Sequence, residues 1–156
     1  MGYVIEIEAN SHPSINGWYD PVKMMVDGDI VFSGIGSTCP NSVRPSSGKT
    51  WKDSYGWIAS GIYNVETCIH PKYGRCVIVN GGGAVPSRND NVNHDGAKIL
   101  TEVFIHEGNR GSSNPLWRGS AGCPTIPPQY WKQFQEALPS GRGILIIKDS
   151  DMGKVC

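Results

Sequence analysis

The chain has 156 residues, which suits one domain with its own hydrophobic core, so we expect a single domain over residues 1–156. Its formal net charge is zero, whereas a nucleic-acid-binding protein would normally carry a basic excess, so we expect no nucleic-acid partner. No apolar run approaches the length of a membrane span, and the 20 Gly and 11 Pro residues favour a β-rich fold with many turns over a helical bundle.

The first half of the chain predicts strands separated by long loops. Residues 3–8 alternate apolar and acidic side chains, as a half-exposed strand does. Residues 22–32 contain Asp27-Gly28 between two apolar runs, which is a strong hairpin signal. Strands are also expected over residues 56–65 and 76–80. Two stretches rich in small and polar residues, 33–49 and 81–95, are expected to be long loops, and long loops inside a compact domain usually carry function.

The second half predicts two strands and the main helix. Residues 99–106 (ILTEVFIH) are rich in β-branched and aromatic side chains and predict a strand ending at His106. Residues 128–138 predict a helix, with Pro128 in its first turn. Residues 143–148 predict a last apolar strand, and residues 149–156 are expected to be a loose tail.

Five cysteines are present, and no CxxC pair indicates a zinc ribbon. Cys68 and Cys76 flank a turn-like stretch, His70-Pro71-Lys72-Tyr73-Gly74. Two interpretations of this pair have similar weight: a disulfide across a hairpin, or two reduced, half-buried thiols. The remaining cysteines are Cys39, Cys123 and Cys156.

Cys123 lies in the run SAGC, between the strand ending at His106 and the helix. A thiol nucleophile needs small neighbours so that substrate can approach, and it needs a base because its ordinary pKa leaves it protonated at neutral pH. His106 can act as that base. Alone, each residue is better explained as structural; together they favour a Cys–His pair.

The stretches IHEG (residues 105–108) and SAGC (residues 120–123) resemble the active-site signature of the L,D-transpeptidase (YkuD-like) family. The resemblance covers roughly residues 18–148 and is strongest over 104–126. It implies a mostly-β, β-sandwich-like fold with one main helix after the catalytic Cys. It also implies a peptidoglycan stem-peptide substrate and a Cys–His mechanism without a cofactor or metal.

The chain departs from that family pattern at two positions. Family members usually carry Arg two residues after the Cys, where this chain has Thr125, and Glu107 separates His106 from the following glycine. Two interpretations of Arg110 and Arg118, between the two motifs, have similar weight: one of them supplies the missing charge, or both are solvated loop residues.

Weaker site candidates surround the pair. Ser120 is expected near the thiolate or the imidazole, with a turn role as the alternative, and backbone N–H groups near Gly122 and Cys123 are expected to form an oxyanion hole. Trp117 lies between the two motifs and is a substrate-binding candidate, as is His94, although an ordinary loop role fits His94 better. A zinc site using His106 and Cys123 is conceivable, but the ligand spacing is not diagnostic.

We therefore expect a cysteine peptidase, an L,D-carboxypeptidase or endopeptidase that degrades bacterial cell wall, such as a phage lysin or a secreted effector. The alternatives are an L,D-transpeptidase and a non-catalytic wall-binding module. Residues 1–10 show no signal peptide, so we expect synthesis in the cytoplasm and action at the wall after release or delivery.

Overall fold

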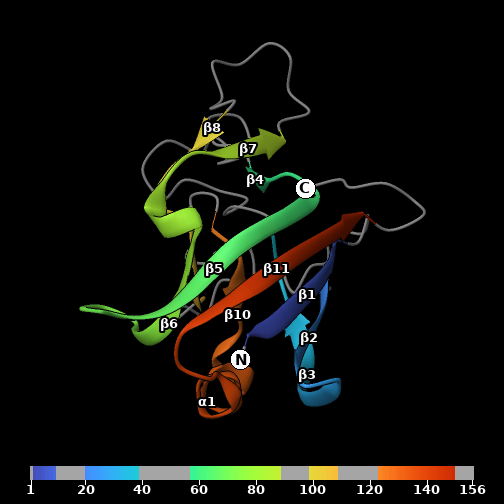
Figure 1. Cartoon of the computed structure of the whole chain (residues 1–156). Helices are drawn as coiled ribbons and strands as arrows, with labels where there is room; N and C mark the ends of the chain where they lie inside the picture. Colours follow the sequence, from blue (N-terminus) through green and yellow to red (C-terminus); the bar gives the residue numbers. More distant parts are fainter. Residues whose placement is uncertain (1, 10–19, 39–56, 89–98, 109–122, 150–156) are drawn as a thin grey trace.

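A computed structural model describes residues 2–9, 20–38, 57–88, 99–108 and 123–149. Its described strands form an eight-stranded mixed sheet with the order β10-β9-β6-β5-β11-β1-β2-β3. Figure 1 shows the long strands β5 and β11 side by side, with β1 along the other edge of β11. The strands of this sheet are β1 (Tyr3–Ala9), β2 (Asp20–Val26), β3 (Asp29–Gly36), β5 (Gly61–His70), β6 (Gly74–Val79), β9 (Phe104–Glu107), β10 (Thr125–Ile126) and β11 (Arg142–Asp149).

A second, three-stranded sheet has the order β4-β7-β8, with β4 at Trp57–Ile58, β7 at Val85–Arg88 and β8 at Ile99–Leu100. A short 3-10 helix, η2 (Asn80–Gly82), follows β6. The single α-helix in the described part of the chain, α1 (Pro128–Ala137), lies between β10 and β11 in sequence. The prediction of a mostly-β fold with one main helix after Cys123 is confirmed.

The core lies on one face of the large sheet, because alternate strand residues point to that face. Ile5 and Ile7 of β1, Met24 of β2 and Leu145 of β11 are all buried. Helix α1 adds Phe134, which packs edge-on against Phe32 of β3 with ring centroids 5.4 Å apart. This packing explains why the helix forms here: its apolar positions cover the core, and Pro128 stands in its first turn.

Several sequence predictions are confirmed closely. The β2–β3 hairpin turns at Asp27 and Gly28, whose φ angles are 52° and 85°, as a tight hairpin turn requires. The strands expected over residues 3–8, 76–80 and 143–148 are β1, β6 and β11, and the helix expected over 128–138 is α1. No helix in the described ranges is long and apolar enough to cross a bilayer.

Both predicted long loops are partly wrong. Residues 33–36 continue β3 because β2 pairs with them as far as Gly36. A Cβ at Gly36 would lie 2.8 Å from the Thr125 carbonyl oxygen, so this glycine permits close packing of strands. In the second stretch, η2 and β7 are present where a loop was predicted, as far as Arg88. Residues 39–49 and 89–95 lie outside the described residues.

Two predicted strands are each divided. The stretch 56–65 contains β4 and the start of β5, which belong to different sheets, and β5 continues to His70. The strand predicted over 99–106 is divided into β8 and β9 by Glu102, whose φ angle of 54° is incompatible with an extended strand. The strand carrying His106 ends one residue later, at Glu107. Asp149 belongs to β11, and the remainder of the expected tail lies outside the described residues.

Candidate active site

His106 and Cys123 are brought together by strand pairing: the strand carrying His106 pairs with the strand that begins two residues after Cys123. His106 is on β9, and Thr125 of β10 pairs with it in parallel register. Cys123 stands two residues before Thr125 in the chain, and the His106 backbone N–H donates to the carbonyl of the intervening Pro124 at 3.3 Å. Direct hydrogen bonding between the His106 ring and the Cys123 sulfur stays a prediction.

The Cys123 sulfur is held by the backbone just before His106. The Phe104 N–H donates to this sulfur at 3.5 Å, and the thiol donates to the Glu102 carbonyl oxygen at 3.8 Å. Burial raises the pKa of the Cys123 thiol, and the Phe104 N–H, which favours the thiolate, opposes that effect. The resting group is therefore a protonated thiol, which needs a base in order to attack.

His106, on the same strand as Phe104, is the candidate base. Its side chain is 3% exposed, and its Nδ1 lies 2.8 Å from the Glu107 carbonyl oxygen. A carbonyl can only accept, so Nδ1 carries the hydrogen and, in the neutral ring, Nε2 keeps its lone pair. Burial lowers the pKa of His106 to about 4, so the ring is neutral at pH 7. The Glu107 backbone carbonyl thus selects the tautomer that carries hydrogen on Nδ1.

The turn of the β5–β6 hairpin packs beside His106. The Tyr73 ring stacks on the His106 ring, with centroids 4.0 Å apart and planes 15° from parallel. His70 lies against Tyr73 and, edge-on, against Phe104. Sequence reasoning treated His70 as a plain turn residue and did not identify Tyr73. The facing cysteines indicated a hairpin there, but no sequence signal placed its turn against β9.

Helix α1 is connected to this hairpin turn by hydrogen bonds. The Gln135 side-chain amide donates to the carbonyls of Tyr73 and Arg75, at 3.4 and 3.0 Å. The Arg75 guanidinium in turn donates to the Leu138 carbonyl oxygen at 2.7 Å. The hairpin turn is therefore tied to a rigid element, which keeps Tyr73 in place against the imidazole.

Thr125 is buried and pairs in register with His106. It is 1% exposed, and its backbone pairs with Ser37 through N–H···O bonds of 2.8 and 2.9 Å. Its hydroxyl has no hydrogen-bond partner among the described residues. An arginine placed here would have to bury its charge, which is costly without a partner.

Glu102 adopts a backbone conformation that is uncommon for a residue with a side chain. Its φ angle is 54°, its N–H donates to the Gly82 carbonyl at 3.0 Å, and its own carbonyl faces the Cys123 thiol. Such strain often occurs at functional sites, where surrounding contacts maintain it. Here the η2 segment maintains it and so helps to orient the thiol.

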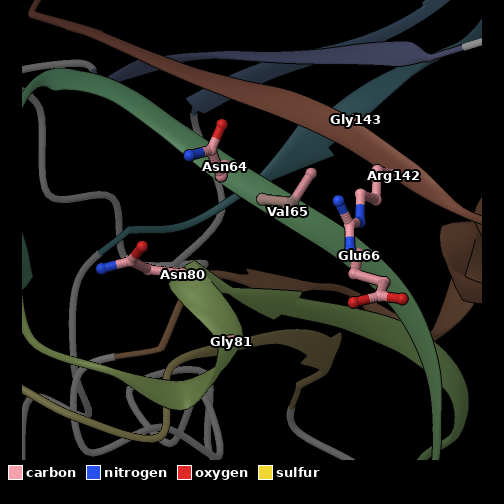
Figure 2. Close-up of a pocket in the computed structure, with 7 residues that line it drawn as sticks. All are labelled: Asn64, Val65, Glu66, Asn80, Gly81, Arg142 and Gly143. Carbon is pink, nitrogen blue, oxygen red and sulfur yellow. The ribbon is translucent and has the colours of Figure 1, made fainter.

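A shallow polar pocket of about 350 Å³ lies over β5, η2 and β11 (Figure 2). The figure shows the Glu66 and Arg142 side chains close together at one end and Asn64 and Asn80 at the other. Neither Cys123 nor His106 lines it, but Gly81 does, and the next residue, Gly82, contacts Glu102. The pocket is thus linked to the thiol through the backbone and is separate from the reacting groups.

The other site predictions stay predictions. Across the described ranges, no group of three or more His, Cys, Asp or Glu side chains could hold a metal ion. Six candidates lie outside the described residues: Ser120, Gly122, Arg110, Arg118, Trp117 and His94.

The buried neutral imidazole has a consequence for folding. Unfolding returns the pKa of His106 from about 4 to its ordinary 6.5. Between these pH values the unfolded chain binds a proton that the folded chain does not, so stability falls as pH drops through this window. We expect His106 to account for a loss of about 3 kcal/mol in unfolding free energy between pH 7 and pH 4.

Urea unfolding at pH 7.0, 5.5 and 4.5 measures this loss. His106→Gln should show a shallower pH dependence than the parent. An unchanged slope in His106→Gln would mean that this imidazole is not buried in its neutral form.

Comparisons with known proteins give structural likenesses only. No protein-family model matches the chain, and no curated protein matches it significantly. Its structure is similar to the helical cell shape determining protein Pgp2 from Campylobacter jejuni, with 12% identity, a TM-score of 0.48, and coverage of 99% of this chain and 51% of that one. It is also similar to the Ldtfm-avibactam carbamoyl enzyme, with 13% identity, a TM-score of 0.43, and coverage of 96% and 50%. The chain spans about half the length of these proteins.

Proposed function

We propose that this protein is a cysteine peptidase that cleaves peptidoglycan stem peptides at the bacterial cell wall, with Cys123 as nucleophile and His106 as base. One observation carries the chemistry. The Cys123 sulfur accepts a hydrogen bond from the Phe104 N–H, on the strand that carries His106. The Glu107 carbonyl oxygen faces His106 Nδ1, which leaves Nε2 as the proton acceptor of the neutral ring. The resemblance of IHEG and SAGC to the L,D-transpeptidase signature supports the choice of substrate class.

In the proposed reaction, Cys123 Sγ attacks the carbonyl carbon of a stem-peptide bond while its proton passes to His106 Nε2. Backbone N–H groups near Gly122 and Cys123 stabilise the oxyanion. The imidazolium then gives the proton to the leaving amine, and the C–N bond breaks to leave a thioester on Cys123. Water, deprotonated by His106, attacks the thioester, releases the new carboxylic acid and restores the thiol.

The alternative fate of the thioester is attack by a second amine, which would make the protein an L,D-transpeptidase. Aminolysis requires the acceptor to be positioned, and an Arg after the Cys can bind a carboxylate through a bidentate fork. The buried Thr125 hydroxyl cannot reproduce that contact. We therefore favour hydrolysis, with Arg110 and Arg118 as the residues to test if amine transfer occurs.

Product analysis distinguishes the two outcomes. Purified protein is incubated with a mixture of monomeric and cross-linked muropeptides, with and without an added D-amino acid, and products are identified by mass. We expect hydrolysed peptides to exceed cross-linked or exchanged ones. Dominant exchange or new cross-links would establish the transpeptidase instead, and Arg110→Ala and Arg118→Ala would then show which residue holds the carboxylate. Binding without turnover would favour a wall-binding module.

A further inference from the structure

A pair of thiols lies on the hairpin that supports His106. Cys68 of β5 and Cys76 of β6 are directly opposite in the antiparallel register, and their sulfurs are 3.7 Å apart. Both are free thiols. Directly opposite residues in an antiparallel pair have Cα atoms about 4.5–5.5 Å apart, within the range that a disulfide spans. Side-chain adjustment alone can therefore bring the sulfurs to bonding distance.

We propose that Cys68 and Cys76 form a reversible disulfide that clamps the β5–β6 hairpin when the protein meets a hydroperoxide. The proposal concerns the hairpin itself and does not depend on the substrate of Cys123.

The two thiols differ in burial, and this difference decides which of them reacts first with the oxidant. Cys76 is completely buried, whereas Cys68 is only partly buried, so an oxidant in solution meets Cys68 first. Burial, with further effects from Cys68 and Cys123, raises the pKa of Cys76 to about 12, which makes it a poor initial nucleophile.

The oxidation proceeds in two balanced steps. The Cys68 thiolate attacks the terminal oxygen of the hydroperoxide, the O–O bond breaks, and protonation gives an alcohol and a sulfenic acid on Cys68. The Cys76 sulfur then attacks the Cys68 sulfur. Its proton leaves with the hydroxyl group as water, and the S–S bond forms. Two thiols are oxidised by two electrons, which the hydroperoxide accepts.

The disulfide would act on the hairpin turn that packs beside His106. The hairpin turn presents Tyr73 to His106, and α1 ties the turn through Gln135 and Arg75. A disulfide before the turn restricts the opening of the two strands. Oxidation is therefore expected to stabilise the hairpin, with a rise in melting temperature of about 5 °C.

Peptide mapping tests the pair directly. The full chain is treated with hydrogen peroxide, free thiols are blocked with iodoacetamide, and tryptic peptides are analysed by mass without reduction. Trypsin cuts after Lys72 and Arg75, so a Cys68–Cys76 bond joins two otherwise separate peptides. We expect this linked pair, its loss on reduction with dithiothreitol, and the rise in melting temperature.

Variants make the test specific. Cys68→Ala, at the partly buried position, should lose both the linked peptides and the thermal shift, whereas Cys39→Ala should keep both. Carbamidomethylation of both Cys68 and Cys76 after peroxide treatment would overturn the proposal. A dominant Cys76–Cys123 linkage would also overturn it, because the nucleophile rather than Cys68 would then be the partner of Cys76.

Discussion

Replacing Cys123 with serine should lower the rate of muropeptide cleavage by at least about 10⁴-fold while leaving the fold intact. Serine is slightly smaller than cysteine, so its side chain fits the same space without a clash. Its hydroxyl, however, is far less acidic than a thiol, and a neutral imidazole adapted to a thiol does not deprotonate it effectively. The measurement is product formation by mass, with thermal unfolding to verify the fold.

The acyl-enzyme gives a second measurement of the same prediction. Intact-mass analysis of quenched reactions should show a covalent adduct on the parent protein and none on Cys123→Ser. Cys39→Ala and Cys156→Ala serve as matched controls and should keep both turnover and adduct. A folded Cys123→Ser protein that cleaves muropeptides at the parent rate would rule out Cys123 as the nucleophile.

The parts of the fold that could be predicted depend on local patterns. Asp27-Gly28 accommodates the positive φ angles of a tight turn, so the β2–β3 hairpin was accessible to sequence reasoning. Helix α1 was accessible through Pro128 and the spacing of Trp131 and Phe134. In each case the deciding interactions lie within about ten residues.

The failures arose where distant contacts decide the conformation. Gly34 and Gly36 looked like loop residues, yet at Gly36 a side chain would collide with β10 from the other end of the chain. Glu102 interrupts an apolar run that otherwise predicts one strand, and its unusual backbone is supported by Gly82. Neither contact leaves a signal in the neighbouring sequence.

At the site, too, local features could be predicted and distant contacts could not. Cys123 and His106 were selected for their chemistry, and β9, which carries His106, pairs with β10, which begins two residues after Cys123. Tyr73 was not found, because an aromatic residue in a turn gives no sign of what it packs against. Its stacking on His106 follows from the β5–β6–β9 strand order, a tertiary property. Gly122 and the substrate-binding candidates lie outside the described residues, and the oxyanion hole stays a prediction.

His106→Ala is expected to lower turnover by about 10²- to 10⁴-fold, the usual contribution of a positioned general base. The raised pKa of Cys123 strengthens this expectation, because the thiol does not ionise by itself at neutral pH. The loss should appear mainly in kcat, since the proton transfer belongs to the attack step rather than to substrate binding. The matched control, His70→Ala, removes an imidazole from the neighbouring β5–β6 hairpin and should change kcat far less.

Chemical rescue separates loss of the base from loss of shape. His106→Ala leaves a ring-sized space beside Tyr73, whose face is available to stack on a small aromatic molecule. Added imidazole should occupy this space and restore part of the rate in a saturable manner. The rescued rate should increase with pH as free imidazole loses its proton. Tyr73→Leu combined with His106→Ala should weaken the rescue, because the stacking surface is gone. Full activity of a folded His106→Ala protein without imidazole would show that another group takes the thiol proton.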